Sequence, residues 1–157
     1  MKDNFYIALE SAQDTFTNPV SEIDHPSMLM AMGFLPGDMV NKDIMRNTLH
    51  RVLKTWDWKA KIWGWDYPMI AMTAVRLGDP ELAVDILLKD APHNHYLNNG
   101  NCPQTEDLPV YLPANGALLS AVALMAAGFD ETGSEKLPGF PKNGKWEVKF
   151  ENINKLP

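Results

Sequence analysis

The chain has 157 residues, with 14 Lys and Arg against 20 Asp and Glu, so its formal net charge is −6 at pH 7. This length allows one domain with a sizeable core, and the acidic balance excludes the basic stripe that a nucleic-acid partner requires. No run of about 18 apolar residues is present, as a membrane span would require, and the N-terminal stretch lacks the apolar core of a signal peptide. We therefore expect a soluble protein that binds neither nucleic acid nor a membrane, with its localisation left open.

Apolar residues at helical spacing, bounded by capping and breaking residues, predict a mainly α-helical chain. The expected helices cover residues 5–16, about 24–33, 41–56 and 68–77, a further one opening at Pro80, and 115–127. Gly78 is expected as the residue that closes one helix, and Asp79 with Pro80 as the start of the next. These two helices therefore form an αα-hairpin with a very short connection.

The last predicted helix and the segment after it differ in pattern. Asn115 is expected to cap this helix and Gly128 to end it, and its residues are apolar nearly all round, which predicts deep burial. Residues 144–153 alternate apolar and charged side chains, which predicts a β-strand. Its partner is either a hairpin with residues 131–144 or another part of a larger protein. We expect a helical-hairpin domain over 1–130 and an extension with this strand over 131–157.

Between residues 91 and 113 lies a polar loop rich in Asn, Pro and Gly, which is unusual in a compact helical domain unless it carries a function. The loop contains His93 and His95, but no third ligand accompanies them, and the single cysteine, Cys102, has no partner for a disulfide or a zinc site. We therefore expect neither a metal nor another cofactor.

The chain contains HPSMLMAMGFLPGD, then GWDYPMIAMTAVRLGDPELAVDIL, then the long loop, then LPANGALLSAVALMAAG. In this order the segments resemble the last helices of the catalytic domain of six-hairpin glycosidases, most closely the alpha-L-fucosidase family with its (α/α)6 barrel. The resemblance implies part of an α/α-hairpin toroid, followed by the first strand of a β domain. It also implies a glycoside hydrolase-like protein or fragment whose ligand is an oligosaccharide or glycan.

The same resemblance implies that this chain is incomplete as a catalyst. The family's base-side aspartate should precede the Asn115-Gly116 pair, where this chain has Leu112, Pro113 and Ala114. Its general acid belongs to an earlier part of the barrel. Since glycoside hydrolysis normally uses two carboxyl groups flanking the scissile bond, one half of the machinery is missing.

The strongest candidate site is the acid at the start of the helix that follows KIWGW. Asp66 is the candidate catalytic carboxylate, because Trp63, Trp65 and Tyr67 surround it in sequence, can stack on sugar rings and can raise its pKa by desolvation. The alternative is that Asp66 caps the helix and the tryptophans fill the space between hairpins. Glu106, in the long loop, is the second candidate carboxylate, with a solvated loop as its alternative.

Three further residues are candidates for substrate binding. His25 stands at the start of the second predicted helix, and His95 lies in the loop that would line the cleft. The resemblance places Asn115 at the barrel mouth, where its amide can bind a sugar hydroxyl.

A different function is a non-catalytic helical interaction module. Part of a toroid leaves an apolar edge where the missing hairpins would dock, and such an edge needs a cover. This alternative predicts a homodimer or association with the missing part of the barrel.

Overall fold

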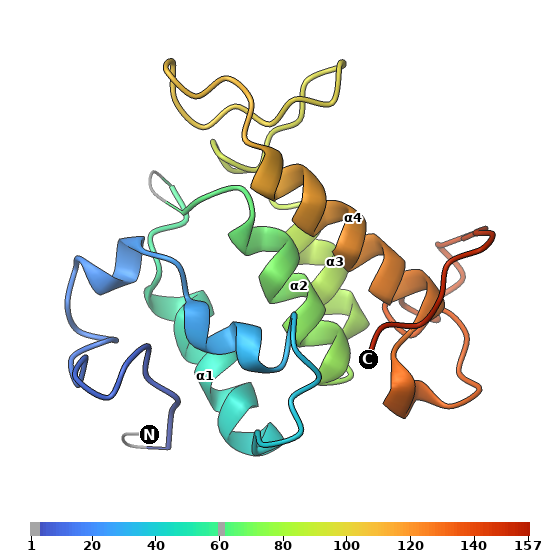
Figure 1. The fold of residues 1–157 in the computed structure, drawn as a ribbon, viewed down its shortest axis with the longest axis horizontal. Coiled ribbons are helices and arrows are strands. Elements are labelled where there is room, and N and C mark those ends of the chain that lie inside the picture. The colour runs from blue at the N-terminus through green and yellow to red at the C-terminus, as the bar shows by residue number, and fades with distance from the viewer. Residues whose placement is uncertain (1–3, 60–61) are drawn as a thin grey trace.

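The computed structural model describes residues 4–59 and 62–157 and is mainly helical (Figure 1). In these two ranges it contains four α-helices: α1 (Lys42–Thr55), α2 (Asp66–Arg76), α3 (Pro80–Leu87) and α4 (Leu112–Ala127). Three short 3-10 helices accompany them, η1 (Ser21–Ile23), η2 (Ser27–Ala31) and η3 (Asp130–Thr132). No helix in the described ranges is both long enough and apolar enough to span a bilayer.

Helix α2 forms the centre of the fold, and every residue from Asp66 to Arg76 is buried. It packs against α3 and α4 on one side and against η2 and α1 on the other (Figure 1). Its buried Asp66, Thr73 and Arg76 side chains are hydrogen-bonded, as burial requires. The Thr73 hydroxyl, for example, donates to the carbonyl oxygens of Leu29 and Met69, at 3.2 and 3.1 Å. The residues at the start of α2 are therefore held on a rigid element.

The predicted hairpin between the helices at 68–77 and 80 onward is confirmed as α2 and α3. Gly78 has φ 78°, and its N–H donates to the carbonyl of Val75 at 2.9 Å, so it ends α2 in the left-handed conformation that glycine favours. Asp79 is the N-cap of α3, accepting from the Leu82 N–H at 3.0 Å, and Pro80 follows at the first helical position.

Two predicted helices near the N-terminus are wrong in extent or kind. Residues 5–16 form bends and turns, in which the Thr15 hydroxyl donates to Ala12 O and accepts from Ala8 N. Such side-chain bonds compete with helical ones. In the predicted helix at 24–33 only η2 forms, and no side chain caps it.

Helix α4 begins at Leu112, three residues before the predicted start, so Asn115 lies inside the helix and does not cap it. The prediction that the helix is buried all round is also wrong. Ala121 and Leu124 are fully buried, whereas Leu112 and Leu119 are 69% and 73% exposed. One face of α4 therefore has no covering element in the described structure.

The strand predicted over 144–153 does not form. Among the described residues the C-terminal segment makes only an isolated parallel bridge, in which Asp130 N donates to Leu156 O and Leu156 N to Gly128 O, both at 3.1 Å. Residues 131–144 do not supply the hairpin partner, and a strand without a partner has no ladder to join.

Candidate functional site

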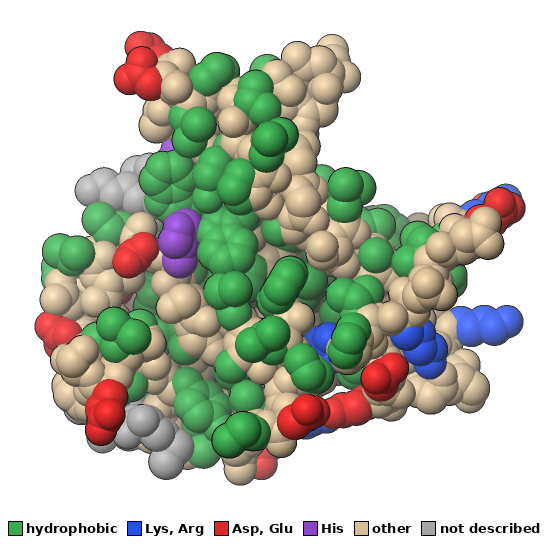
Figure 2. Space-filling model, in the orientation of Figure 1, with side chains coloured by type: hydrophobic (Ala, Val, Ile, Leu, Met, Phe, Trp, Pro, Cys, Tyr) green, Lys and Arg blue, Asp and Glu red, His purple; other side chains and the backbone are tan. Residues whose placement is uncertain are grey.

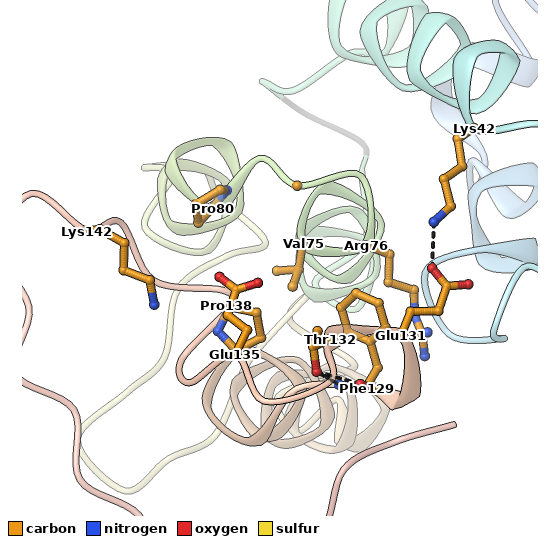
Figure 3. A pocket seen from close by; sticks show the side chains of 11 residues that line it. Lys42, Val75, Arg76, Pro80, Phe129, Glu131, Thr132, Glu135, Pro138 and Lys142 are labelled. Atoms are coloured by element: carbon orange, nitrogen blue, oxygen red, sulfur yellow. Dashed lines mark hydrogen bonds and ion pairs between the residues drawn. The ribbon is translucent and has the colours of Figure 1, made fainter.

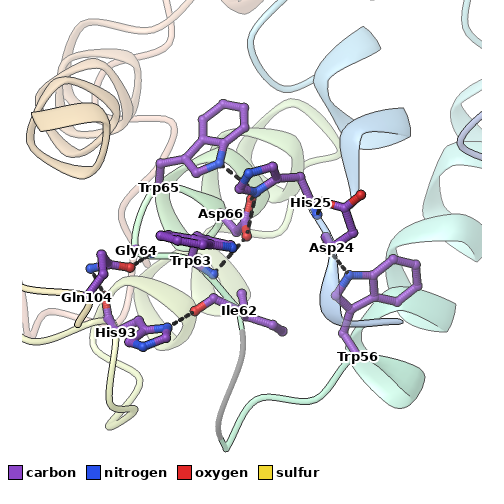
Figure 4. Close-up of polar contacts among 10 residues, drawn as sticks. All are labelled: Asp24, His25, Trp56, Ile62, Trp63, Gly64, Trp65, Asp66, His93 and Gln104. Carbon is purple, nitrogen blue, oxygen red and sulfur yellow. Dashed lines mark hydrogen bonds and ion pairs between the residues drawn. The ribbon is translucent and has the colours of Figure 1, made fainter. Parts of the chain in front are cut away.

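The first residue of α2, Asp66, is completely buried and fully engaged in hydrogen bonds. Its Oδ2 accepts from the Trp63 N–H at 3.1 Å, and its two oxygens lie 2.9 and 3.1 Å from Nδ1 of His25 (Figure 4). The N-cap is Trp65, with no side-chain cap, so Asp66 acts one position inside the helix. At this position its charge is favourable to the helix dipole, and the carboxylate faces an imidazole instead of solvent.

His25 presents one nitrogen to two different partners. Its Nδ1 faces Asp66 and also lies 2.8 Å from the indole Nε1 of Trp65 (Figure 4). An indole N–H can only donate, and an ionised carboxylate can only accept, so Nδ1 satisfies one of them at a time. When Nδ1 carries a proton it donates to Asp66, and when it does not it accepts from Trp65. The presence or absence of a proton on Nδ1, which depends on both the charge and the tautomer of His25, therefore selects its partner.

The other ring nitrogen of His25 is open to a ligand. Its side chain is 33% exposed, and Nε2 has no hydrogen bond to any residue in the described ranges. This is a common arrangement for a working histidine, in which a carboxylate orients one nitrogen and the second meets the substrate. His25 thus lies between the buried carboxylate of Asp66 and the solvent, where its Nε2 can meet a ligand.

The pKa values of His25 and Asp66 are both raised above their ordinary values, for different reasons. The hydrogen bond to Asp66 raises the pKa of His25 above its ordinary value, and its partial burial opposes this rise. Burial raises the pKa of Asp66, against the opposing effect of its bonds to His25 and Trp63. Desolvation of an acid and pairing of a base act in the same direction here.

Aromatic rings surround His25 and define what we call the aromatic site, formed by His25, Trp63, Trp65, His93 and Tyr111. The His25 ring centroid lies 5.2 Å from that of Trp65 and 6.2 Å from that of Trp63. Trp63 continues the surface, with its ring centroid 5.5 Å from Tyr111 and 6.2 Å from His93. All five side chains are partly exposed. On the face in Figure 2, histidine side chains lie among hydrophobic ones at the base of the raised loop.

The long loop, residues 91–113, is held next to this site by hydrogen bonds and close contacts at Gly64. The Gly64 N–H donates to Gln104 Oε1 at 2.7 Å, and Gln104 Nε2 donates to the carbonyl of His93 at 3.2 Å (Figure 4). A Cβ at position 64 would lie 2.6 Å from His93 O, 2.9 Å from Gln104 Nε2 and 3.0 Å from the Cys102 sulfur. His93 Nδ1 also donates to Ile62 O at 2.9 Å. Glycine is therefore required for the loop to approach so closely.

Four of the predicted site residues lie elsewhere. Tyr67 is 1% exposed, with its ring against Trp58, and burial raises its pKa to about 12, so its face is not offered to a ligand. Glu106 is exposed in the turn at 105–108 and takes no part in the hydrogen bonds of Asp66. Asn115 braces the loop, since its Nδ2 donates to Gly100 O at 2.8 Å. His95 is exposed and lines a separate hollow.

The site also contains residues that the sequence reasoning did not select. His93 entered only as half of a possible metal pair, yet its ring joins the aromatic site, while His95 does not. Tyr111 stands at the end of the loop, immediately before α4. Gln104 is a buried polar side chain, and no motif or spacing marks it. In the described ranges no group of three His, Cys, Asp or Glu side chains is placed to hold a metal ion.

A second polar hollow lies at the other end of α2, with a volume of about 350 Å³ (Figure 3). Arg76 lines it, donates from Nε to Gly33 O at 3.2 Å and from Nη2 to Pro157 O, and lies 4.7 Å from the centre of the Phe129 ring. Lys42 and Glu131 form an ion pair across its rim. The guanidinium of Arg76 is already bonded to backbone carbonyls. We therefore interpret this hollow as the place where the C-terminal residues pack against α2, and not as a ligand site.

Comparisons of the chain with protein-family models, with curated proteins and with solved structures find no match. The function is therefore inferred from the geometry and chemistry of the aromatic site.

Proposed function

We propose that this chain binds a neutral carbohydrate at the aromatic site, as a glycoside hydrolase-like protein or fragment. The observation that supports this is a partly exposed imidazole, oriented by the buried Asp66, between the rings of two partly exposed tryptophans. A ligand there meets indole faces and one hydrogen-bonding nitrogen in the same place.

This combination suits a sugar better than other small ligands. Sugar rings have apolar C–H faces that pack on aromatic rings and hydroxyl groups that need directional partners, and binding sites commonly combine apolar walls with a few polar groups. The net charge of −6 disfavours a phosphorylated or otherwise anionic ligand. His25 Nε2 is the group that would bind a hydroxyl.

The described site supports binding more strongly than hydrolysis. A glycosidase of the usual kind needs two carboxyl groups beside the bond. Of the two carboxylates next to His25, Asp66 is fully buried behind it, and Asp24 accepts from the His25 backbone N–H at 2.8 Å. Glu106 lies in an exposed turn. We propose that the α2–α3 hairpin belongs to an α/α toroid, in which other hairpins supply the acid and base, and that this chain alone hydrolyses no glycoside.

The test is a titration of tryptophan fluorescence with a panel of neutral oligosaccharides, repeated by calorimetry for each that responds. Trp65→Ala should raise the dissociation constant about tenfold or more, as expected for a central aromatic contact. Trp146→Ala is the matched control, because Trp146 lies on the C-terminal segment and outside the aromatic site. A panel without any response, or equal weakening by both substitutions, would contradict the proposal.

A second candidate function, a non-catalytic interaction module, is favoured by one specific observation. An apolar hollow of about 440 Å³ lies between α3, α4 and the C-terminal segment. Its lining includes Leu88, Val122 and Trp146, which are 71%, 42% and 41% exposed. Contiguous exposed apolar surface of this kind marks places where proteins associate.

A further inference from the structure

The C-terminal segment from Lys145 to Glu151, with the sequence KWEVKFE, forms no regular secondary structure. A bend at residues 142–144 precedes it and another at Asn152 follows it, with φ values of 75° at Gly144 and 56° at Asn152. No backbone group of residues 146–154 is hydrogen-bonded to any residue in the described ranges. The segment projects beyond the end of α4, at the right of Figure 1. Residues 146–151 therefore offer free backbone donors and acceptors.

This segment reads the same in both directions when residues are grouped by chemistry. Val148 is at its centre, with an aromatic residue two positions away on each side, Trp146 and Phe150. The intervening positions carry charge in the order Lys145, Glu147, Lys149, Glu151. In a strand, successive side chains point to opposite faces, so one face is wholly apolar and the other wholly charged.

We propose that two copies of this chain associate through residues 145–151, which pair as antiparallel β-strands about a two-fold axis at Val148. Every opposed pair in this arrangement is complementary. Lys145 opposes the partner's Glu151, Glu147 opposes the partner's Lys149, Trp146 opposes the partner's Phe150, and Val148 opposes itself. A two-fold axis repeats each unlike pair, so four opposite-charge contacts form from one segment.

The charge order also disfavours the nearest alternative registers. If one strand slides by two residues toward either end, Glu147 or Lys149 opposes its own copy, and Lys145 opposes Lys149 or Glu147 opposes Glu151. A parallel in-register pair likewise places every charge against the same charge. Like charges directly opposed in a sheet are destabilising, so these alternatives are disfavoured.

The apolar face of the paired strands has a surface to cover. An isolated two-stranded ribbon is marginal in water and needs a hydrophobic face packed against another element. Trp146 already lines the apolar hollow with Leu88 and Val122, and its ring centroid lies 5.6 Å from that of Phe140. The inference gives the second candidate function a defined partner, a second copy, and is independent of carbohydrate binding.

The experiment measures the mass of the full-length protein by sedimentation equilibrium over a range of concentrations. The wild type should dimerise, and Lys149→Glu should raise the dimer dissociation constant about tenfold or more, because the symmetry creates two Glu–Glu contacts. The double exchange E147K/K149E restores every opposite-charge pair and should restore the dimer. Lys136→Glu is the matched control, since it makes the same change in charge at an exposed residue outside the segment.

A second measurement checks the axis itself. Val148→Cys should form an intermolecular disulfide on mild oxidation, because the two-fold axis places the two residues 148 opposite each other, while Cys102 is fully buried and does not compete. Val110→Cys, 39% exposed on the long loop, is the control that should not cross-link. A monomer at all concentrations, a dimer insensitive to K149E, or equal cross-linking at 110 and 148 would overturn the proposal. Oligosaccharide titration of K149E tests the aromatic site separately.

Discussion

The two ends of the molecule satisfy their polar groups in opposite ways. At the start of α2, segments distant in sequence meet, and Asp66, Gly64 and Gln104 find their hydrogen-bond partners within the chain. Around α3, α4 and the C-terminal segment, Leu88, Leu112 and Leu119 are exposed, and the backbone groups of residues 146–154 have no partner among the described residues. The first region is built to hold a few side chains in place for a small ligand. The second has the free groups that association with another chain requires.

The largest difference in stability between the two regions is expected at Gly64, where the long loop contacts the start of α2. Gly64→Ala forces a Cβ to within 3.0 Å of three heavy atoms, including the backbone oxygen of His93, so we expect a loss of about 3 kcal/mol in the free energy of unfolding. Gly116→Ala is the control in the open region, because nothing lies within 4 Å of its added Cβ. There, inside α4, alanine should stabilise by about 0.5–1 kcal/mol.

Urea denaturation of both variants measures these effects. Opposite signs would confirm that one region is closely packed and the other open. An equal, small effect of both substitutions would show that the loop is not fastened at Gly64.

The next effect concerns the charge behind His25. Asp66→Asn removes the main cause of the raised pKa of His25, so that pKa should fall toward 6.5 in an NMR titration of the imidazole. The buried site also loses a charge-assisted hydrogen bond, which should cost about 2 kcal/mol of stability. Asp24→Asn is the matched control, because Asp24 is exposed and makes the smallest contribution to the same pKa. If both substitutions lower the pKa equally, the pairing of His25 with Asp66 is not the cause.

Local parts of this architecture were predictable from sequence, and long-range parts were not. Gly78, Asp79 and Pro80 specify the α2–α3 turn because the chemistry of each acts within a few residues. Asn115 misled the prediction, since Asn-Gly resembles a helix start, while α4 begins with Leu112 and Pro113 in its first turn. The tryptophans and Asp66 were selected together from their adjacency.

The pairing of Asp66 with His25 lay beyond the reach of sequence spacing. The two residues are 41 positions apart, and Gln104 is 40 positions from the glycine that it binds. Only the packing of η2 and of the long loop against the start of α2 brings these groups together. The alternating C-terminal segment shows the reverse case, because its pattern predicts a strand, whereas a strand forms only where a partner is present.

The hydrogen bond between His25 and Asp66 should make the free energy of unfolding depend on pH. The pKa of His25 is raised in the folded state, so the folded protein binds that proton more tightly than the unfolded chain. This contribution is complete below pH 6.5 and is lost as pH rises through the folded-state pKa. The raised pKa of Asp66 acts in the same direction at lower pH.

Thermal unfolding at stepped pH, together with tryptophan emission, follows this loss. Emission should change over the same interval, because the imidazole 5.2 Å from the Trp65 ring loses its positive charge there. In His25→Gln both the emission change and this part of the pH dependence should disappear. A wild type whose stability rises across the interval would contradict the assigned direction.

The smallest effect is expected on the open face of α4. Leu119 is 73% exposed, so Leu119→Gln should change the free energy of unfolding by no more than about 0.5 kcal/mol. Leu124 in the same helix is fully buried, and Leu124→Gln should cost at least about 3 kcal/mol, because it places an amide in the core without a partner. Helix propensity is nearly the same for both substitutions, so the difference measures burial alone. The comparison is made in the K149E variant, at a concentration where it is monomeric. If Leu119→Gln is there as damaging as Leu124→Gln, this face of α4 is covered within a single chain, which would contradict its exposure.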